Sequence, residues 1–327
     1  MEQMRILVTS DCNLKCTHCY QHYDKNKWRL SFEKITELID YAEKKHVNTL
    51  FFSGGEFFTH DSAYKIIESC MDKGLNITLA TNGIYVNTDF FEKYAKLHKI
   101  TFQISIDGMK MNHNKRRGEG SFEKTMCTVK KLRNLGVPII CSMAVDETNF
   151  MDMIHVLHIP EFSKVNFLPV AHTGAAKNIC RSYDDMAYQY YEKTLLNIYR
   201  KHIALGKSTS LYPDSLGIKY NGDVYLSPVA QDMDVFCIGN IYEDSLDSIL
   251  ESYEKRDLYE LIRRNNDILI ECKKCEKNQQ CVGKSIERAY KVNGNIEGSI
   301  HGDVVFLKIC TQRYLSDKFF GEIYKYE

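Results

Sequence analysis

The chain has 327 residues, of which 44% are apolar, so it is long enough to bury a large core and to form about two domains. Lys and Arg together number 43, as do Asp and Glu, and this balance excludes the basic excess of a dedicated nucleic-acid binder. The start of the chain has no apolar signal-peptide core, and no stretch is apolar enough to span a membrane. We therefore expect a cytoplasmic protein with neither nucleic acid nor membrane among its partners.

Strand and helix signals alternate along the first two thirds of the chain. The alternating or apolar runs predict strands over residues 5–10, 48–52, 77–81, 101–106, 138–145 and 165–170. Amphipathic patterns predict helices over residues 31–45, 62–73, 89–97, 121–135, 151–157 and 183–205. Ser31 suits the N-cap of the first helix, and Gly74 suits the end of the second. This order predicts an α/β fold, a partial (β/α)6 TIM-like barrel whose site lies at the carboxyl ends of the strands.

The pattern changes after about residue 206. Asn221-Gly222-Asp223 separates two short apolar runs, which predicts a β-hairpin. Helical stretches follow over residues 246–252 and 257–264, and then a cysteine-rich segment. We therefore expect a barrel over residues 1–205 and a small α+β domain, stiffened by a metal site, over residues 206–327.

Three cysteines, Cys12, Cys16 and Cys19, directly follow the first predicted strand. In a reducing compartment such a group indicates metal ligands and not disulfides. Three thiolates on a short loop suit an iron–sulfur cluster and leave one iron of a 4Fe–4S cubane without a protein ligand. Zinc is the alternative, but it usually takes four ligands, and the only nearby fourth, His18, is confined between two of the cysteines.

Further motifs follow at the ends of later strands. These are Gly54, Gly55 and Glu56 after the second strand, Asn82 after the third, Ser105 and Asp107 at the fourth, and Arg117 twelve residues after Ser105. In this order, behind a CxxxCxxC triad, they resemble the radical S-adenosylmethionine (radical SAM) superfamily. The resemblance implies a 4Fe–4S cluster on the three cysteines and SAM bound by the seven later residues, with Ser105 and Arg117 on its carboxylate. Phe57 departs from the family, which usually has proline there.

The cysteines near the end of the sequence form a second candidate site, with Cys272, Cys275, Cys281 and Cys310 as ligands. From the residues alone, a structural zinc site and an iron–sulfur cluster fit equally well. With the hairpin and Gly239-Asn240, the region resembles a SPASM domain, which implies an auxiliary 4Fe–4S cluster. Ser227 and Ser285 stand where a second auxiliary cluster would need cysteines, so we expect a degenerate SPASM domain with one auxiliary cluster. Cys237 is a candidate hydrogen-atom donor.

The resemblance implies an enzyme that cleaves SAM reductively to a 5′-deoxyadenosyl radical, which abstracts a hydrogen atom. It favours post-translational modification of a ribosomal peptide or protein by cross-linking, epimerisation or oxidation. The alternative is a radical SAM dehydrogenase or decarboxylase acting on a small molecule, and a third reading is a non-enzymatic zinc-binding module. The expected partners are the peptide, a flavodoxin or ferredoxin as reductant and, because the sequence opens directly on the first strand, a separate leader-binding protein.

Overall fold

The computed structural model describes residues 1–19, 27–146, 148–170, 175, 215–226 and 234–254. The chain divides into two compact units. The first contains Met1–Leu205 and Leu211–Cys237, and the second contains Gly206–Ser210 and Ile238–Glu327.

The first unit is built on one largely parallel sheet. Its six leading strands lie side by side in chain order: β1 (Gln3–Leu7), β2 (Thr49–Ser53), β3 (Ile77–Thr81), β4 (Ile100–Ser105), β5 (Ile139–Val145) and β6 (Lys164–Pro169). β7 (Ser215–Ile218) pairs in parallel with the free edge of β1, and β8 (Asp223–Tyr225) pairs with β7 in antiparallel fashion. The expected hairpin is therefore present, and it extends the sheet of the first unit although its sequence lies after residue 206.

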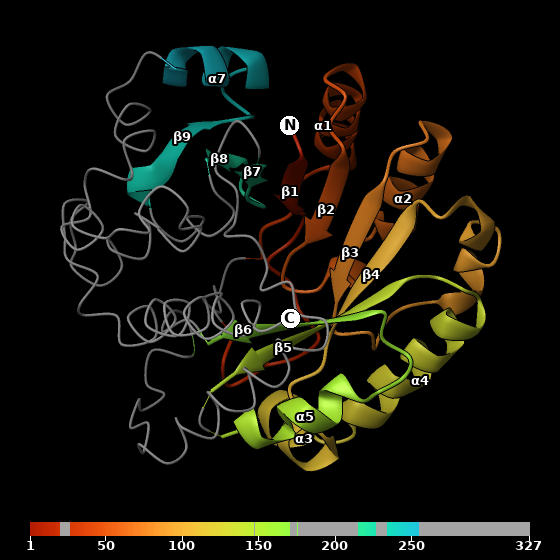
Figure 1. Cartoon of the computed structure of the whole chain (residues 1–327). Coiled ribbons are helices and arrows are strands. Elements are labelled where there is room, and N and C mark those ends of the chain that lie inside the picture. Colours follow the sequence, from red (N-terminus) through yellow and green to blue (C-terminus); the bar gives the residue numbers. More distant parts are fainter. Residues whose placement is uncertain (20–26, 147, 171–174, 176–214, 227–233, 255–327) are drawn as a thin grey trace, which may run out of the picture. The chain divides into compact units, whose positions relative to one another are not determined.

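Helices connect successive parallel strands and lie along one side of the curved sheet (Figure 1). They are α1 (Phe32–Lys44), α2 (Ala63–Asp72), α3 (Lys110–Arg117), α4 (Ser121–Asn134) and α5 (Met153–Leu157). Alternate strand residues such as Ile6, Phe102 and Met143 are fully buried, together with helix residues such as Ile66 and Val129. The core therefore lies between the sheet and its helices, as expected for βαβ units.

Most predicted elements are confirmed within two residues. The Ser31 side chain accepts a hydrogen bond from the Lys34 backbone N–H at 3.2 Å, as an N-cap should. The predicted helix over residues 89–97 is instead two 3-10 turns, η2 (Thr88–Phe91) and η3 (Ala95–Leu97). α3 was not predicted, because its sequence KMNHNKRR has no apolar stripe. The helices predicted over residues 183–205 and 257–264 lie outside the described residues.

The second unit is described over a short stretch. β9 (Cys237–Asn240) is followed by α7 (Leu246–Glu254). A Cβ atom added at Gly239 would press against the Ile249 side chain at 2.9 Å, so α7 packs directly on the strand. None of the described helices in either unit is long and apolar enough to cross a membrane.

The loop after β1 crosses closely over the end of β2. The Gly55 N–H donates to the Thr9 carbonyl and the Glu56 N–H donates to the Asp11 carbonyl, both at 2.7 Å. Gly54 has a φ of +157°, and a Cβ atom added there would lie 2.5 Å from the Thr9 oxygen. A Cβ atom at Gly55 would overlap the Asp11 carbonyl. The glycine pair therefore lets the backbone that leads to Cys12 pass directly over β2.

We expect Gly55→Ala to lower the free energy of unfolding by about 2–3 kcal/mol, because the new methyl group must displace backbone atoms. Gly74→Ala is the control: nothing lies within 4 Å of a Cβ added at Gly74, although Gly74, unlike Gly55, has a positive φ, of +65°. The control should cost about 1 kcal/mol through its backbone conformation alone. Denaturant unfolding of both variants measures the difference. Equal losses in the free energy of unfolding would contradict a close crossing of the β1 loop over β2.

Candidate functional site

The three predicted N-terminal cysteines lie on the loop that follows β1. Cys16 is buried, Cys19 is half-buried and Cys12 is exposed, and none forms a disulfide. The Thr17 N–H donates to the Arg116 carbonyl at 3.0 Å, which ties the loop to the end of α3. The Asn82 side-chain amide donates to the Asn13 side chain at 2.7 Å, which ties it to the end of β3. Contacts from separate elements thus hold the loop over the carboxyl ends of the strands.

Two hydrogen-bond donors point at the cysteine sulfurs. The Leu14 N–H donates to Cys12 Sγ at 3.4 Å, and Arg117 Nη1 donates to Cys16 Sγ at 3.9 Å. Burial nevertheless raises the pKa of the Cys16 thiol. Buried thiolates here would need a cationic partner, and bound iron supplies one.

The candidate fourth zinc ligand on this loop is engaged by another residue. Among the residues that the structure describes, no three His, Cys, Asp or Glu side chains gather closely enough to hold one ion. His18, the candidate fourth zinc ligand, instead contacts the carboxylate of Asp107 through Nε2 at 3.0 Å. A 4Fe–4S cubane takes each thiolate on a different iron, so three thiols on one loop suit it without His18.

Glu56 joins the ends of β2 and β3. Its carboxylate is 2% exposed and accepts hydrogen bonds from Thr81 Oγ1 at 2.7 Å, the Asn82 N–H at 2.8 Å and the Phe58 N–H at 3.2 Å. Burial raises the pKa of Glu56, and these donors oppose that rise. The carboxylate is therefore occupied in fixing the Asn82 loop, and through Asn82 it supports the cysteine loop.

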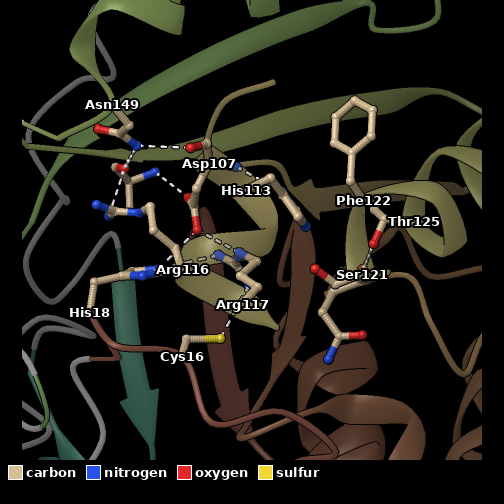
Figure 2. A network of polar contacts seen from close by, with 12 residues as sticks. Cys16, His18, Asp107, His113, Arg116, Arg117, Ser121, Phe122, Thr125 and Asn149 are labelled. Carbon is tan, nitrogen blue, oxygen red and sulfur yellow. Dashed lines mark hydrogen bonds and ion pairs between the residues drawn. The ribbon is translucent and has the colours of Figure 1, made fainter. Parts of the chain in front are cut away.

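Asp107 is the centre of a buried polar network (Figure 2). Its Oδ2 faces Arg117 Nε and His18 Nε2, while its Oδ1 accepts from the Ala144 N–H at 2.9 Å. Burial is the largest single influence and opposes ionisation of this carboxyl, but the charge of Arg117 acts together with His18 and Arg116 and holds the pKa of Asp107 well below its usual range. Asp107 is therefore a carboxylate that holds α3, β5 and the cysteine loop together.

Arg116, the neighbour of Arg117 on α3, faces a different carboxylate. Its Nη1 donates to Asp146 Oδ2 at 2.6 Å, and both side chains are almost fully buried. Its Nη2 donates to the Ala144 carbonyl at 3.2 Å. This ion pair fixes α3 to the end of β5, which leaves Arg117 turned toward the cysteines.

A row of polar side chains lines the sheet face opposite the helices. Ser105 on β4 is in register with Ser142 on β5, and Ser142 is in register with Asn166 on β6. Among the described residues, the buried Asn166 Oδ1 has no hydrogen-bond partner, and the hydroxyl of the half-buried Ser105 makes no hydrogen bond either. Unpartnered polar groups on one face of adjacent strands are suited to a polar ligand.

Sequence reasoning identified Ser105 in this row but not Ser142 or Asn166. Both are polar residues within otherwise apolar strands. Aligning those strands in register with Ser105 could have identified them. Of the other predicted site residues, Cys237 opens β9 and is half-buried. Cys272, Cys275, Cys281 and Cys310 lie outside the described residues.

Relatives of the chain in sequence include a bacteriocin biosynthesis protein and a heme synthase. The antilisterial bacteriocin subtilosin biosynthesis protein AlbA of Bacillus subtilis is 26% identical over 261 residues, which cover 75% of this chain and 58% of AlbA. The AdoMet-dependent heme synthase of Methanosarcina barkeri is 29% identical over 150 residues, which cover 45% of this chain and 43% of the synthase. The chain therefore spans less than two thirds of either relative.

The fold has a close counterpart among solved structures. The structure of native anSMEcpe with bound AdoMet and Kp18Cys peptide has a TM-score of 0.76 at 17% identity, and the match covers 99% of this chain and 98% of that one. At this identity the likeness establishes the fold, a TIM-like barrel with a further C-terminal domain, which confirms the predicted fold class.

Family models match both parts of the chain. Residues 6–158 match the Radical SAM superfamily, and residues 213–276 match SPASM, an iron–sulfur cluster-binding domain. The first match contains the cysteine loop and the Asp107 network, and the second contains Cys237, Cys272 and Cys275. The chain therefore contains a radical SAM domain followed by a SPASM domain.

Proposed function

We propose that this protein is a radical SAM enzyme that modifies a ribosomally made peptide or protein. The observation that carries the proposal is the loop of Cys12, Cys16 and Cys19, which is held over the strand ends with donors aimed at two of its sulfurs. When bound, a 4Fe–4S cluster and SAM supply an electron and a 5′-deoxyadenosyl radical that removes a hydrogen atom.

The protein's own groups bind, orient and shield the cofactors. The three thiols hold the cluster, and Gly54 and Gly55 let the loop pass close to β2. Glu56 and Asn82 fix that loop, Asp107 and Arg117 hold it from the side of α3, and Ser105 offers a free hydroxyl to SAM. Cys16, Glu56 and Asp107 are buried, so water has little access to their side of the site.

One auxiliary 4Fe–4S cluster on Cys272, Cys275, Cys281 and Cys310 completes the proposed cofactor set. The SPASM match, which spans Cys272 and Cys275, supports a cluster in this region. With four thiolates such a cluster has no open iron, so we assign it to structure or electron transfer. We place the boundary between the barrel and the SPASM-like domain between residues 205 and 206. Cys237 is the candidate hydrogen-atom donor.

A peptide is the favoured substrate class. AlbA acts in the biosynthesis of a bacteriocin, and the anSMEcpe structure contains a bound peptide, which supports this choice. The proposed partners are therefore the peptide, a leader-binding protein and a flavodoxin or ferredoxin in a reducing cytoplasm. The similarity to a heme synthase favours a second candidate, a small-molecule reaction on a tetrapyrrole.

Replacing Cys12, Cys16 and Cys19 together by Ala should remove one cluster and all SAM cleavage. After anaerobic reconstitution we expect about eight irons per wild-type chain and about four in the variant. The assay counts iron and zinc, and measures 5′-deoxyadenosine formed with dithionite and SAM. Zinc without deoxyadenosine in the wild type would contradict the proposed function. Four irons in the wild type and none in the variant would contradict only the proposed auxiliary cluster.

Ser105→Ala should weaken SAM binding about tenfold or more without loss of iron, because a hydrogen bond to a charged group contributes about 1.5–3 kcal/mol. Thr101→Ala is the matched control, since Thr101 is half-buried on the same face at the other end of β4. Equilibrium binding of SAM to the reconstituted protein measures the effect. Equal affinities for both variants would remove Ser105 from the SAM site.

The two substrate classes differ in the product that they predict. Co-expression with a short peptide encoded beside the gene should change the peptide's mass, as measured by mass spectrometry, and the cysteine-triad variant should abolish that change. A tetrapyrrole substrate should instead lose carbon dioxide. Tetrapyrrole decarboxylation with an unmodified peptide would replace the peptide proposal by the small-molecule one.

A further inference from the structure

Arg117 lies between a buried carboxylate and the cysteine loop (Figure 2). Its Nε donates to Asp107 Oδ2, its Nη1 donates to Cys16 Sγ at 3.9 Å, and its Nη2 lies 3.5 Å from His18 Nε2. Each guanidinium nitrogen thus has a neighbour within the protein. The side chain is only 11% exposed, so water competes little for these contacts.

The direction of the guanidinium is set by groups that do not belong to the loop. Asp107 is fully buried and is itself held by the Ala144 N–H. Its backbone carbonyl accepts from Asn149 Nδ2 at 3.0 Å, and its N–H donates to His113 Nδ1 at 3.2 Å. The Nε contact with Asp107 therefore leaves the outer nitrogens of Arg117 directed at Cys16 and His18.

We propose that Arg117, anchored by Asp107, is an outer-sphere hydrogen-bond donor to Cys16 that raises the reduction potential of the cluster on the N-terminal cysteines; this inference rests on the proposed function. A reduced cluster carries one more negative charge than an oxidised one. An N–H donor and a guanidinium beside a coordinating sulfur stabilise the reduced form more, so they raise the potential.

This role differs from the SAM-carboxylate role that the sequence predicts for Arg117. A carboxylate clamp acts only on bound SAM and leaves the cluster unchanged when SAM is absent. A donor to Cys16 acts on the cluster whether or not SAM is present. The potential of the SAM-free cluster therefore separates the two roles.

The test is a redox titration of reconstituted protein without SAM, followed by electron paramagnetic resonance. The paramagnetic resonance signal of the N-terminal cluster is identified by its loss in the variant that lacks Cys12, Cys16 and Cys19. In Arg117→Gln we expect the reduction equilibrium constant to fall at least tenfold, a shift of about 59 mV to more negative potential. Lys115→Gln is the matched control: it removes a cation from the same helix, but Lys115 is exposed and screened by solvent, so the shift should be small.

Arg117→Lys keeps the charge but cannot bond Asp107 and Cys16 as a fork, and it should shift the potential by less than the Gln variant does. An unchanged potential in Arg117→Gln, with weaker SAM binding, would overturn the inference in favour of the carboxylate clamp. Loss of the cluster from both Arg117 variants, but not from Lys115→Gln, would also overturn it, since Arg117 would then be needed for assembly. A wild-type protein without iron would instead contradict the proposed function itself.

Discussion

The close crossing of the β1 loop over Gly54 and Gly55 is the constraint on which the site depends. Carbonyl groups of Thr9 and Asp11 accept hydrogen bonds from the β2 loop at 2.7 Å, a separation that leaves no room for a Cβ atom. The cysteines begin at the next residue, so their position follows from this backbone contact. The glycines thus act first on the protein's own chain, and Glu56 continues the same connection to β3.

Asp107 provides the second fixed point, on the other side of the loop. A carboxylate buried this deeply would be costly without partners, and here Arg117, His18 and a backbone N–H supply them. Removing one partner from such a buried charge group typically costs about 3–5 kcal/mol. The network therefore makes the position of the cysteine loop depend on the packing of α3 against β5.

The same strands serve the core on one face and the site on the other. Phe102 and Ile104 of β4 are fully buried, whereas Gln103 and Ser105 alternate with them on the opposite face and are half-buried. Period-two alternation lets one strand supply both faces without conflict. Because the parallel strands run in the same direction, their polar carboxyl ends gather beside the cysteine loop.

The sequence by itself determined the parallel α/β fold, most strand positions, the cysteine triad and the motifs at the strand ends, because these depend on local periodicity and spacing. Only the tertiary structure decided what those motifs contact. α3 has no apolar stripe, so its helix and the direction of Arg117 depend on two buried carboxylates, Asp107 shortly before the helix and Asp146 after the next strand. Likewise, Ser142 and Asn166 join Ser105 only through strand register, and the hairpin joins β1 through long-range pairing that no local pattern encodes.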